Sequence, residues 1–192
     1  MAHILITHGT GGSPEGNWFP WLAADLRRRG HTVQVPRYPT PQGQGLQPWL
    51  EVFEKEVGWS ACTSETILVG HSLGAAFNLR LLERLPVPVK ASFLLAGFLG
   101  RIGLPEYDQL NASFLAEPFD WPRIRKNIGR ARIYHGDNDP YVALAKAHEL
   151  AEKIEGAALL VIPGGGHLNA ESGYSKLELL LNDLLLVIKG VR

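Results

Sequence analysis

Short apolar runs alternate with longer amphipathic stretches along the whole chain, and this pattern limits the fold more than any other feature. Six runs rich in Val, Ile and Leu have the length of buried strands: 3–7, 32–36, 66–70, 90–96, 131–135 and 158–162. The stretches between and after them predict helices near 18–29, 46–57, 73–85, 143–154 and 173–189. The pattern predicts an α/β fold, a three-layer sandwich in which a mostly parallel six-stranded sheet carries helices on both faces.

Length and charge agree with this fold. The 192 residues suffice for one well-buried core and are too few for two, so we expect a single domain over residues 1–192. The formal net charge of zero gives no electrostatic reason to expect a nucleic acid or an anionic membrane as partner. We therefore expect a small molecule as the ligand, with any protein partner unknown.

The sequence also predicts a soluble, cytoplasmic protein. The first apolar run is too short for a signal peptide and has no basic residues before it. The apolar run 177–188 contains Glu178, Asn182 and Asp183, which indicates a packed helix rather than a membrane span. The single cysteine, Cys62, excludes an internal disulfide and is compatible with a reducing compartment.

A G-x-S-x-G motif, Gly70-His71-Ser72-Leu73-Gly74, lies between the third apolar run and a helical stretch. In this context the strand delivers the serine to a sharp, strained turn that exposes its hydroxyl, and a helix begins directly after it. A Cβ at Gly70 or Gly74 is expected to collide with the neighbouring strand or helix. Ser72 is therefore the candidate nucleophile, the alternative being a structural turn serine.

A serine hydroxyl needs a base, and three histidines follow Ser72 in the sequence. His148 falls within a predicted helix and suggests a surface or packing role. His135 ends a predicted strand but precedes the candidate acid. His167 follows a strand and the flexible run Pro163-Gly164-Gly165-Gly166, so it is our predicted general base.

Two aspartates follow the fifth predicted strand and compete for the role of the acid. The pattern Gly-x-x-Asp-x-x-Val over residues 136–142 favours Asp139, which would orient the imidazole and stabilise its protonated form. Asp137 is the competitor, and it would otherwise be a turn residue that accepts local backbone amides. In a parallel sheet the loops after the strands meet at one edge, so these groups are expected to cluster.

An acyl-transfer site also needs donors for the oxyanion. The amide of Leu73, the residue after the nucleophile, is one. The glycine-rich segment Gly9-Thr10-Gly11-Gly12 after the first strand is expected to supply the second, from Thr10 or Gly11, unless it is a simple tight turn. It lacks the Gly-Lys-Ser/Thr of a phosphate-binding loop, and Pro14 interrupts it where a dinucleotide-binding helix would begin.

The remaining candidates are substrate-contacting residues. These are Gly11, His71, Phe119 and Trp121; the last two lie in segment 97–128, which is either a lid or substrate wall or an irregular helical excursion. The five tryptophans are expected to be mostly core residues, with one or two at the substrate. No cluster of residues has metal-ligand spacing, so we expect no metal and no cofactor.

These motifs together resemble the α/β-hydrolase superfamily, and within it the small lid-less serine hydrolases. The resemblance covers nearly the whole chain and rests on segments 8–12, 17–22, 70–74, 138–140 and 165–167. It implies a minimal fold in which the first two strands of the superfamily are missing. It also implies a triad of Ser72, Asp139 and His167, in agreement with the interpretation from the residues themselves.

The functional hypothesis is a serine hydrolase that cleaves small, fairly apolar carboxylic esters or thioesters through an acyl-enzyme. A peptidase or amidase with the same triad is the alternative within enzymes. A binding protein without catalytic activity on the same fold is the alternative outside them, because a fold does not determine a function.

Overall fold

The computed structural model of the protein describes residues 1–191. Its six strands form one sheet in the order β2-β1-β3-β4-β5-β6, and every neighbouring pair is parallel. The strands are β1 (His3–Thr7), β2 (Thr32–Gln34), β3 (Thr66–His71), β4 (Ala91–Leu95), β5 (Arg130–Gly136) and β6 (Ala158–Ile162). The predicted parallel six-stranded sheet is confirmed.

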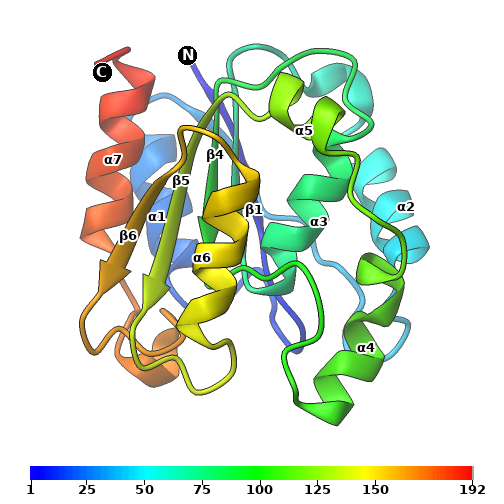
Figure 1. Cartoon of the computed structure of the whole chain (residues 1–192). Coiled ribbons are helices and arrows are strands. Elements are labelled where there is room, and N and C mark those ends of the chain that lie inside the picture. The colour runs from blue at the N-terminus through cyan, green and yellow to red at the C-terminus, as the bar shows by residue number, and fades with distance from the viewer. Residues whose placement is uncertain (192) are drawn as a thin grey trace.

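Seven α-helices cover the sheet on both faces, as predicted. They are α1 (Phe19–Arg28), α2 (Leu46–Glu56), α3 (Leu73–Leu82), α4 (Pro105–Leu115), α5 (Trp121–Asn127), α6 (Leu144–Lys153) and α7 (Glu178–Ile188). Figure 1 shows α1 and α7 on one side of the sheet and α2, α3 and α6 on the other. Within residues 1–191, no helix is both long and apolar enough to cross a bilayer.

The strand order explains this division of the helices. The chain moves in one direction from β1 to β2 and in the opposite direction through β3, β4, β5 and β6. Right-handed crossovers in opposite directions place their helices on opposite faces, so α1 lies on one face and α2, α3 and α6 lie on the other. The order reverses between β1 and β3, and ligands of such sheets bind beside the carboxyl ends of the strands at this switch point.

Two hydrophobic cores, one on each face, fix the sheet. The core under α1 and α7 is built around Trp18, Phe19, Phe93 and Leu184, all fully buried. The larger core, under the other helices, includes Trp49, Phe53, Phe77 and Phe114. The strands between the cores are buried on both faces, which is why they read as continuous apolar runs in the sequence.

The element ends differ modestly from the predicted ones. Strand β2 ends at Gln34 rather than at residue 36, because the proline at position 36 has no amide proton to donate to a ladder. The last helix begins at Glu178 rather than at 173, since Gly173 adopts a left-handed conformation with φ 91° after a 3₁₀ turn. Segment 97–128, predicted as a wall or a helical excursion, contains the two helices α4 and α5.

Candidate active site

Ser72 occupies the sharp turn between β3 and α3. Its φ of 57° is a left-handed conformation that a non-glycine residue adopts only under local strain. A Cβ on Gly70 would lie 2.6 Å from the carbonyl oxygen of Gly74, and a Cβ on Gly74 would lie 2.3 Å from that of Thr7. Both contacts are impossible, which confirms the predicted steric reason for the two glycines. Strand β3, helix α3 and strand β1 are in such close contact that only glycine fits between them.

The glycine-rich segment after β1 lies directly against Ser72. A Cβ added to Gly9 would be 2.8 Å from Cβ of Ser72 and 3.2 Å from its Oγ. The Gly11 amide donates to Oγ1 of Thr40 (2.7 Å), and the Gly12 amide donates to the Gly9 carbonyl (3.1 Å). The Thr10 amide has no acceptor among residues 1–191. Of the two predicted alternatives, Thr10 therefore has the available backbone donor.

Leu73 supplies a second amide of this kind at the start of α3. Its side chain is buried in the core, and no acceptor for its amide is found in the described part of the chain. The first amides of a helix have no partner within the helix and carry a partial positive charge toward any anion at that end. Ser72 thus lies between two backbone segments that can each offer an unpaired N–H.

Asp139 lies in the turn after β5 and holds His167. Its Oδ2 accepts a 2.7 Å hydrogen bond from Nδ1 of His167, while its Oδ1 accepts the amides of Tyr141 (2.8 Å) and Val142 (3.0 Å). Burial by itself would raise the pKa of this carboxyl group, but the hydrogen bond and charge of His167 and the two amides together lower it. Asp139 is therefore a carboxylate at neutral pH, which makes His167 Nδ1 the protonated nitrogen and leaves Nε2 as a base.

The competing aspartate, Asp137, has a different partner. Its Oδ1 accepts the amide of Gly164 at 2.8 Å and so ties the turn after β5 to the loop after β6. The neighbouring histidine, His135, is completely buried and donates from Nε2 to the carbonyl of Val142 (2.8 Å). The exposed His148 lies on α6 and makes no hydrogen bond to these groups within residues 1–191. Within residues 1–191, the one side-chain hydrogen bond between these candidates joins Asp139 and His167, while His135 Nε2 lies 3.7 Å from Asp139 Oδ2, beyond hydrogen-bond distance.

The backbone around His167 is held at three points. The His167 amide donates to Oγ of Ser172 (3.1 Å), and its carbonyl accepts from Nε2 of His71 at 2.8 Å. The next residue, Leu168, has a φ of 52°, and its carbonyl accepts from Nε1 of Trp18 at 2.9 Å. A non-glycine residue in this conformation is strained, so the three hydrogen bonds stabilise a loop conformation that would otherwise relax.

His71 was predicted to contact substrate, and the structure gives its imidazole a different partner. The ring is buried, and it packs 4.8 Å from the His167 ring. Burial, together with the nearby His167, lowers its pKa to about 3, so it is neutral at physiological pH. With the carbonyl of His167 as its acceptor, Nε2 carries the proton. The residue borders the pocket, and its Nε2 is engaged by the His167 carbonyl.

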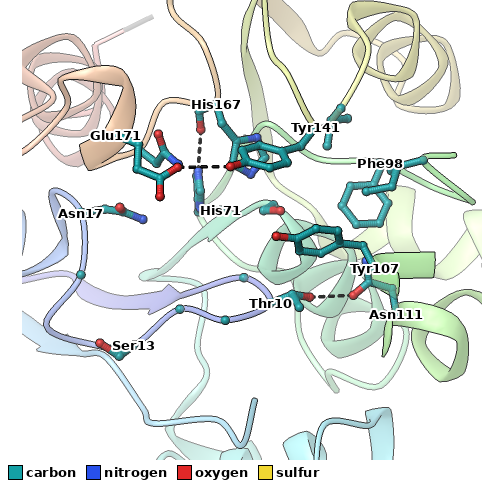
Figure 2. Close-up of a pocket in the computed structure, with 18 residues that line it drawn as sticks. Thr10, Ser13, Asn17, His71, Phe98, Tyr107, Asn111, Tyr141, His167 and Glu171 are labelled. Carbon is teal, nitrogen blue, oxygen red and sulfur yellow. Dashed lines mark hydrogen bonds between the residues drawn. The ribbon is translucent and has the colours of Figure 1, made fainter. Parts of the chain in front are cut away.

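Ser72 and His167 line the same pocket, of about 330 Å³, and Figure 2 shows His167 at its edge. Among the described residues no hydrogen bond joins the two side chains, and the Ser72 hydroxyl and His167 Nε2 are both left without a protein partner. Such bonds are often long in free enzymes and form when substrate binds. The site therefore contains a strained serine, an oriented imidazole, a buried carboxylate and two unpaired amides around one cavity.

Comparison with known proteins shows which family the chain belongs to. The sequence pattern of the family described as Serine hydrolase matches residues 4–185. The chain belongs to this family. The match includes every group of the site described above.

Individual proteins similar to this chain support the family assignment. YdeN of Bacillus subtilis (strain 168) is 28% identical over 183 residues, which cover 94% of this chain and 93% of YdeN. The serine hydrolase RBBP9 of Rattus norvegicus is 24% identical over 167 residues, covering 86% of each chain. The crystal structure of YdeN superposes with a TM-score of 0.89 at 27% identity, covering 98% of this chain and 100% of that one. Est1E from Butyrivibrio proteoclasticus shares the fold at 17% identity, with a TM-score of 0.71 over 98% of this chain and 88% of its own. The predicted resemblance to small hydrolases of the α/β-hydrolase superfamily is confirmed.

The pocket of this serine hydrolase family member has two kinds of wall. Phe98, Tyr107 and Tyr141 form an aromatic side, and Asn17 and Glu171 lie on the opposite, polar side (Figure 2). Tyr141 links the two by donating from its hydroxyl to Oε2 of Glu171 at 3.2 Å. Among the described residues, the ionisable side chains that line the pocket belong to two histidines, two tyrosines and Glu171. The cavity therefore carries a carboxylate and no lysine or arginine.

Phe119 and Trp121 do not line this pocket, contrary to the prediction. Both pack against the larger core, and the Phe119 ring lies under the guanidinium of Arg80, 3.9 Å from its centre. None of the five tryptophans borders the cavity. Helix α4 contributes Tyr107 to the aromatic wall instead. A signal for it existed in the sequence: residues 107, 111 and 114 have the spacing that places side chains on one helical face.

Proposed function

We propose that this hydrolase cleaves small carboxylic esters or thioesters through a covalent acyl-enzyme formed on Ser72. The observation that carries the proposal is the 2.7 Å hydrogen bond between Asp139 Oδ2 and His167 Nδ1, beside a strained serine that faces the same cavity. The bond directs the Nδ1 proton of His167 to Asp139, so Nε2 is the nitrogen that we propose receives the proton of the Ser72 hydroxyl.

The proposed reaction gives each of these groups one role. His167 Nε2 takes the Ser72 proton as Oγ attacks the substrate carbonyl, and the amides of Leu73 and Thr10 stabilise the negative charge that develops on the carbonyl oxygen. The imidazolium, stabilised by the Asp139 carboxylate, gives its proton to the departing alkoxide or thiolate. Water attacks the acyl-enzyme with His167 again as the base, and the acid and Ser72 are released.

The substrate class is supported by the cavity. Its volume of about 330 Å³ is at the small end for ligand sites. Side chains of the pocket supply both apolar contacts and hydrogen bonds, so we propose small acyl groups of mixed character rather than the fairly apolar ones first expected. We also propose that the protein acts in a reducing, cytoplasmic compartment on free small molecules, which is in keeping with a single buried cysteine and a neutral net charge.

Covalent labelling with a fluorophosphonate, followed by intact-mass measurement, tests the proposal on wild type and Ser72→Ala. We expect one adduct on wild type, none on the variant, and a loss of ester hydrolysis in the variant of at least about 10³-fold. A folded wild type that neither reacts nor hydrolyses any ester would support a binding protein. Matched 4-nitrophenyl esters and 4-nitroanilides distinguish an esterase from an amidase, because an amide nitrogen must be protonated to leave.

A further inference from the structure

We infer that Asn111 is a specificity-determining residue, whose side-chain amide donates a hydrogen bond to an acceptor oxygen carried by the acyl chain of the substrate. The inference rests on the proposed function. Asn111 lies on α4 and borders the pocket although its exposed fraction is only 2%. A buried primary amide of this kind needs partners for both its oxygen and its nitrogen.

The oxygen of Asn111 is fully engaged. Its Oδ1 accepts from Oγ1 of Thr10 at 2.6 Å, the bond drawn in Figure 2, and from Nε2 of Gln44 at 3.0 Å. The nitrogen is not: within residues 1–191, Nδ2 of Asn111 donates to no protein acceptor, and it is not among the polar atoms sealed from solvent. The unpaired donor of this nearly buried side chain therefore faces the cavity.

The orientation of this amide is supported by a chain of hydrogen bonds that begins at a backbone N–H. The Gly11 amide can only donate, and it donates to Oγ1 of Thr40, whose own proton then goes to Oε1 of Gln44 at 2.6 Å. With its oxygen accepting, Gln44 presents Nε2 to Thr10 Oγ1 (3.2 Å) and to Asn111. With these directions both hydroxyls and the Gln44 amide of the network donate to an acceptor, and Asn111 presents its oxygen to the network and its nitrogen to the pocket.

The side of the pocket on which Asn111 lies identifies the part of the substrate that it contacts. The leaving group must lie beside His167, because it takes its proton from Nε2. In Figure 2, Asn111 and Tyr107 lie on the side of the cavity away from His167 and Glu171. The acyl chain extends toward Asn111, so the acceptor is a hydroxyl, ether or carbonyl oxygen within a few bonds of the scissile carbonyl.

Pairs of esters that differ by one oxygen atom test the inference. The 4-nitrophenyl esters of methoxyacetic and 3-methoxypropanoic acid are compared with those of butanoic and pentanoic acid, in which a methylene replaces the oxygen. The Asn111→Asp variant keeps an oxygen for Thr10 and Gln44 and replaces the donor by a second oxygen. Asn111→Leu removes the donor without adding charge. The ratio of kcat/KM within each pair is compared between wild type and variants, so the intrinsic activation by the ether oxygen cancels.

We expect the preference for the oxygen-bearing ester in at least one pair to fall about 5- to 30-fold in both variants, the range for loss of one buried hydrogen bond. Ratios that stay within about twofold of wild type in both pairs would overturn the inference and leave Asn111 a purely structural residue. Fluorophosphonate labelling of the variants shows that Ser72 is still activated. A wild type that does not label and does not hydrolyse these esters would instead refute the proposed function, and the inference with it.

Discussion

The imidazole of His71 donates from Nε2 to the backbone carbonyl of His167 across 2.8 Å, although the two residues are 96 positions apart in the sequence. His71 immediately precedes Ser72, so the last residue of β3 holds the loop that carries the imidazole opposite the serine. The two loops leave different strands, β3 and β6, and this contact connects them directly. Its consequence is that the relative position of Ser72 and His167 depends on a side chain that takes no part in the proposed chemistry.

Replacing His71 tests this positioning role. His71→Met removes the donor with a side chain of similar length, and we expect kcat to fall about 10- to 100-fold with little change in KM, because a displaced base affects the chemical step. His71→Gln retains an N–H donor at a similar reach and should recover most of the loss. Steady-state kinetics and the rate of fluorophosphonate labelling measure both effects. Equal losses in the two variants would indicate that packing, rather than the hydrogen bond, is responsible.

Acid should destabilise this fold beginning near pH 6.5. Burial lowers the pKa of His71 to about 3 from an ordinary value of 6.5, and it also lowers the pKa values of His8 and His135. Unfolded histidines take up protons that the folded ones do not, so the stability present above pH 6.5 is lost as the pH falls. Between its folded pKa and pH 6.5, His71 contributes about 1.4 kcal/mol per pH unit, and His8 and His135 act in the same direction.

Urea unfolding between pH 7.5 and 4.5 measures this slope. In His71→Gln the dependence of the unfolding free energy on pH should decrease by about one proton between pH 6 and pH 4.5. Asp139 acts in the same direction at lower pH, because its folded pKa is below the ordinary 3.8. A variant with the wild-type slope would show that His71 is protonated in the folded protein.

The two aspartates after β5 form a matched pair for mutagenesis. Asp139→Asn removes the carboxylate that fixes the His167 tautomer and stabilises the imidazolium, and we expect kcat to fall on the order of 10³- to 10⁴-fold. Asp137→Asn keeps an oxygen that can accept the Gly164 amide, and kcat should stay within about threefold. Initial rates on one activated ester measure both. Comparable losses in the two variants would refute the assignment of Asp139.

The glycines of the elbow predict a stability difference. Gly74→Ala places a Cβ 2.3 Å from the Thr7 carbonyl oxygen, so β1 and α3 must separate, and we expect a loss of about 2–4 kcal/mol or more. Gly100→Ala adds a Cβ with no atom within 4 Å and is the control, expected within about 0.5 kcal/mol of wild type. Thermal and urea unfolding of the two variants measure this difference in stability. A Gly74→Ala protein as stable as the control would mean that the contact at the elbow can relax.

The strands, the elbow and the cluster of loops were predictable because each depends on local sequence or on one rule of topology. Six short apolar runs and their helical partners suffice for a parallel sheet. Once the sheet is parallel, the segments after β1, β3, β5 and β6 must meet at one edge, which brings Ser72, Asp139 and His167 into one neighbourhood. The linear order of the residues contains all of this.

Other features depended on partners that are distant in the sequence. Asp139 and Asp137 both follow β5, and only the path of the loop after β6 gives His167 to one and Gly164 to the other. Thr10 and Gly11 are adjacent amides, and the position of Thr40 engages one of them.

The aromatic wall of the pocket is the clearest feature that depended on tertiary packing. Phe119 and Trp121 were predicted for it because of their residue type, yet α4 brings Tyr107 and Asn111 to the cavity while α5 follows the larger core. Periodicity and turn residues report how a segment folds on itself. Which of two similar side chains meets a partner 28 or 101 residues away is settled by how the helices and loops pack on the sheet, since hydrogen bonds form only where packing brings donor and acceptor within reach.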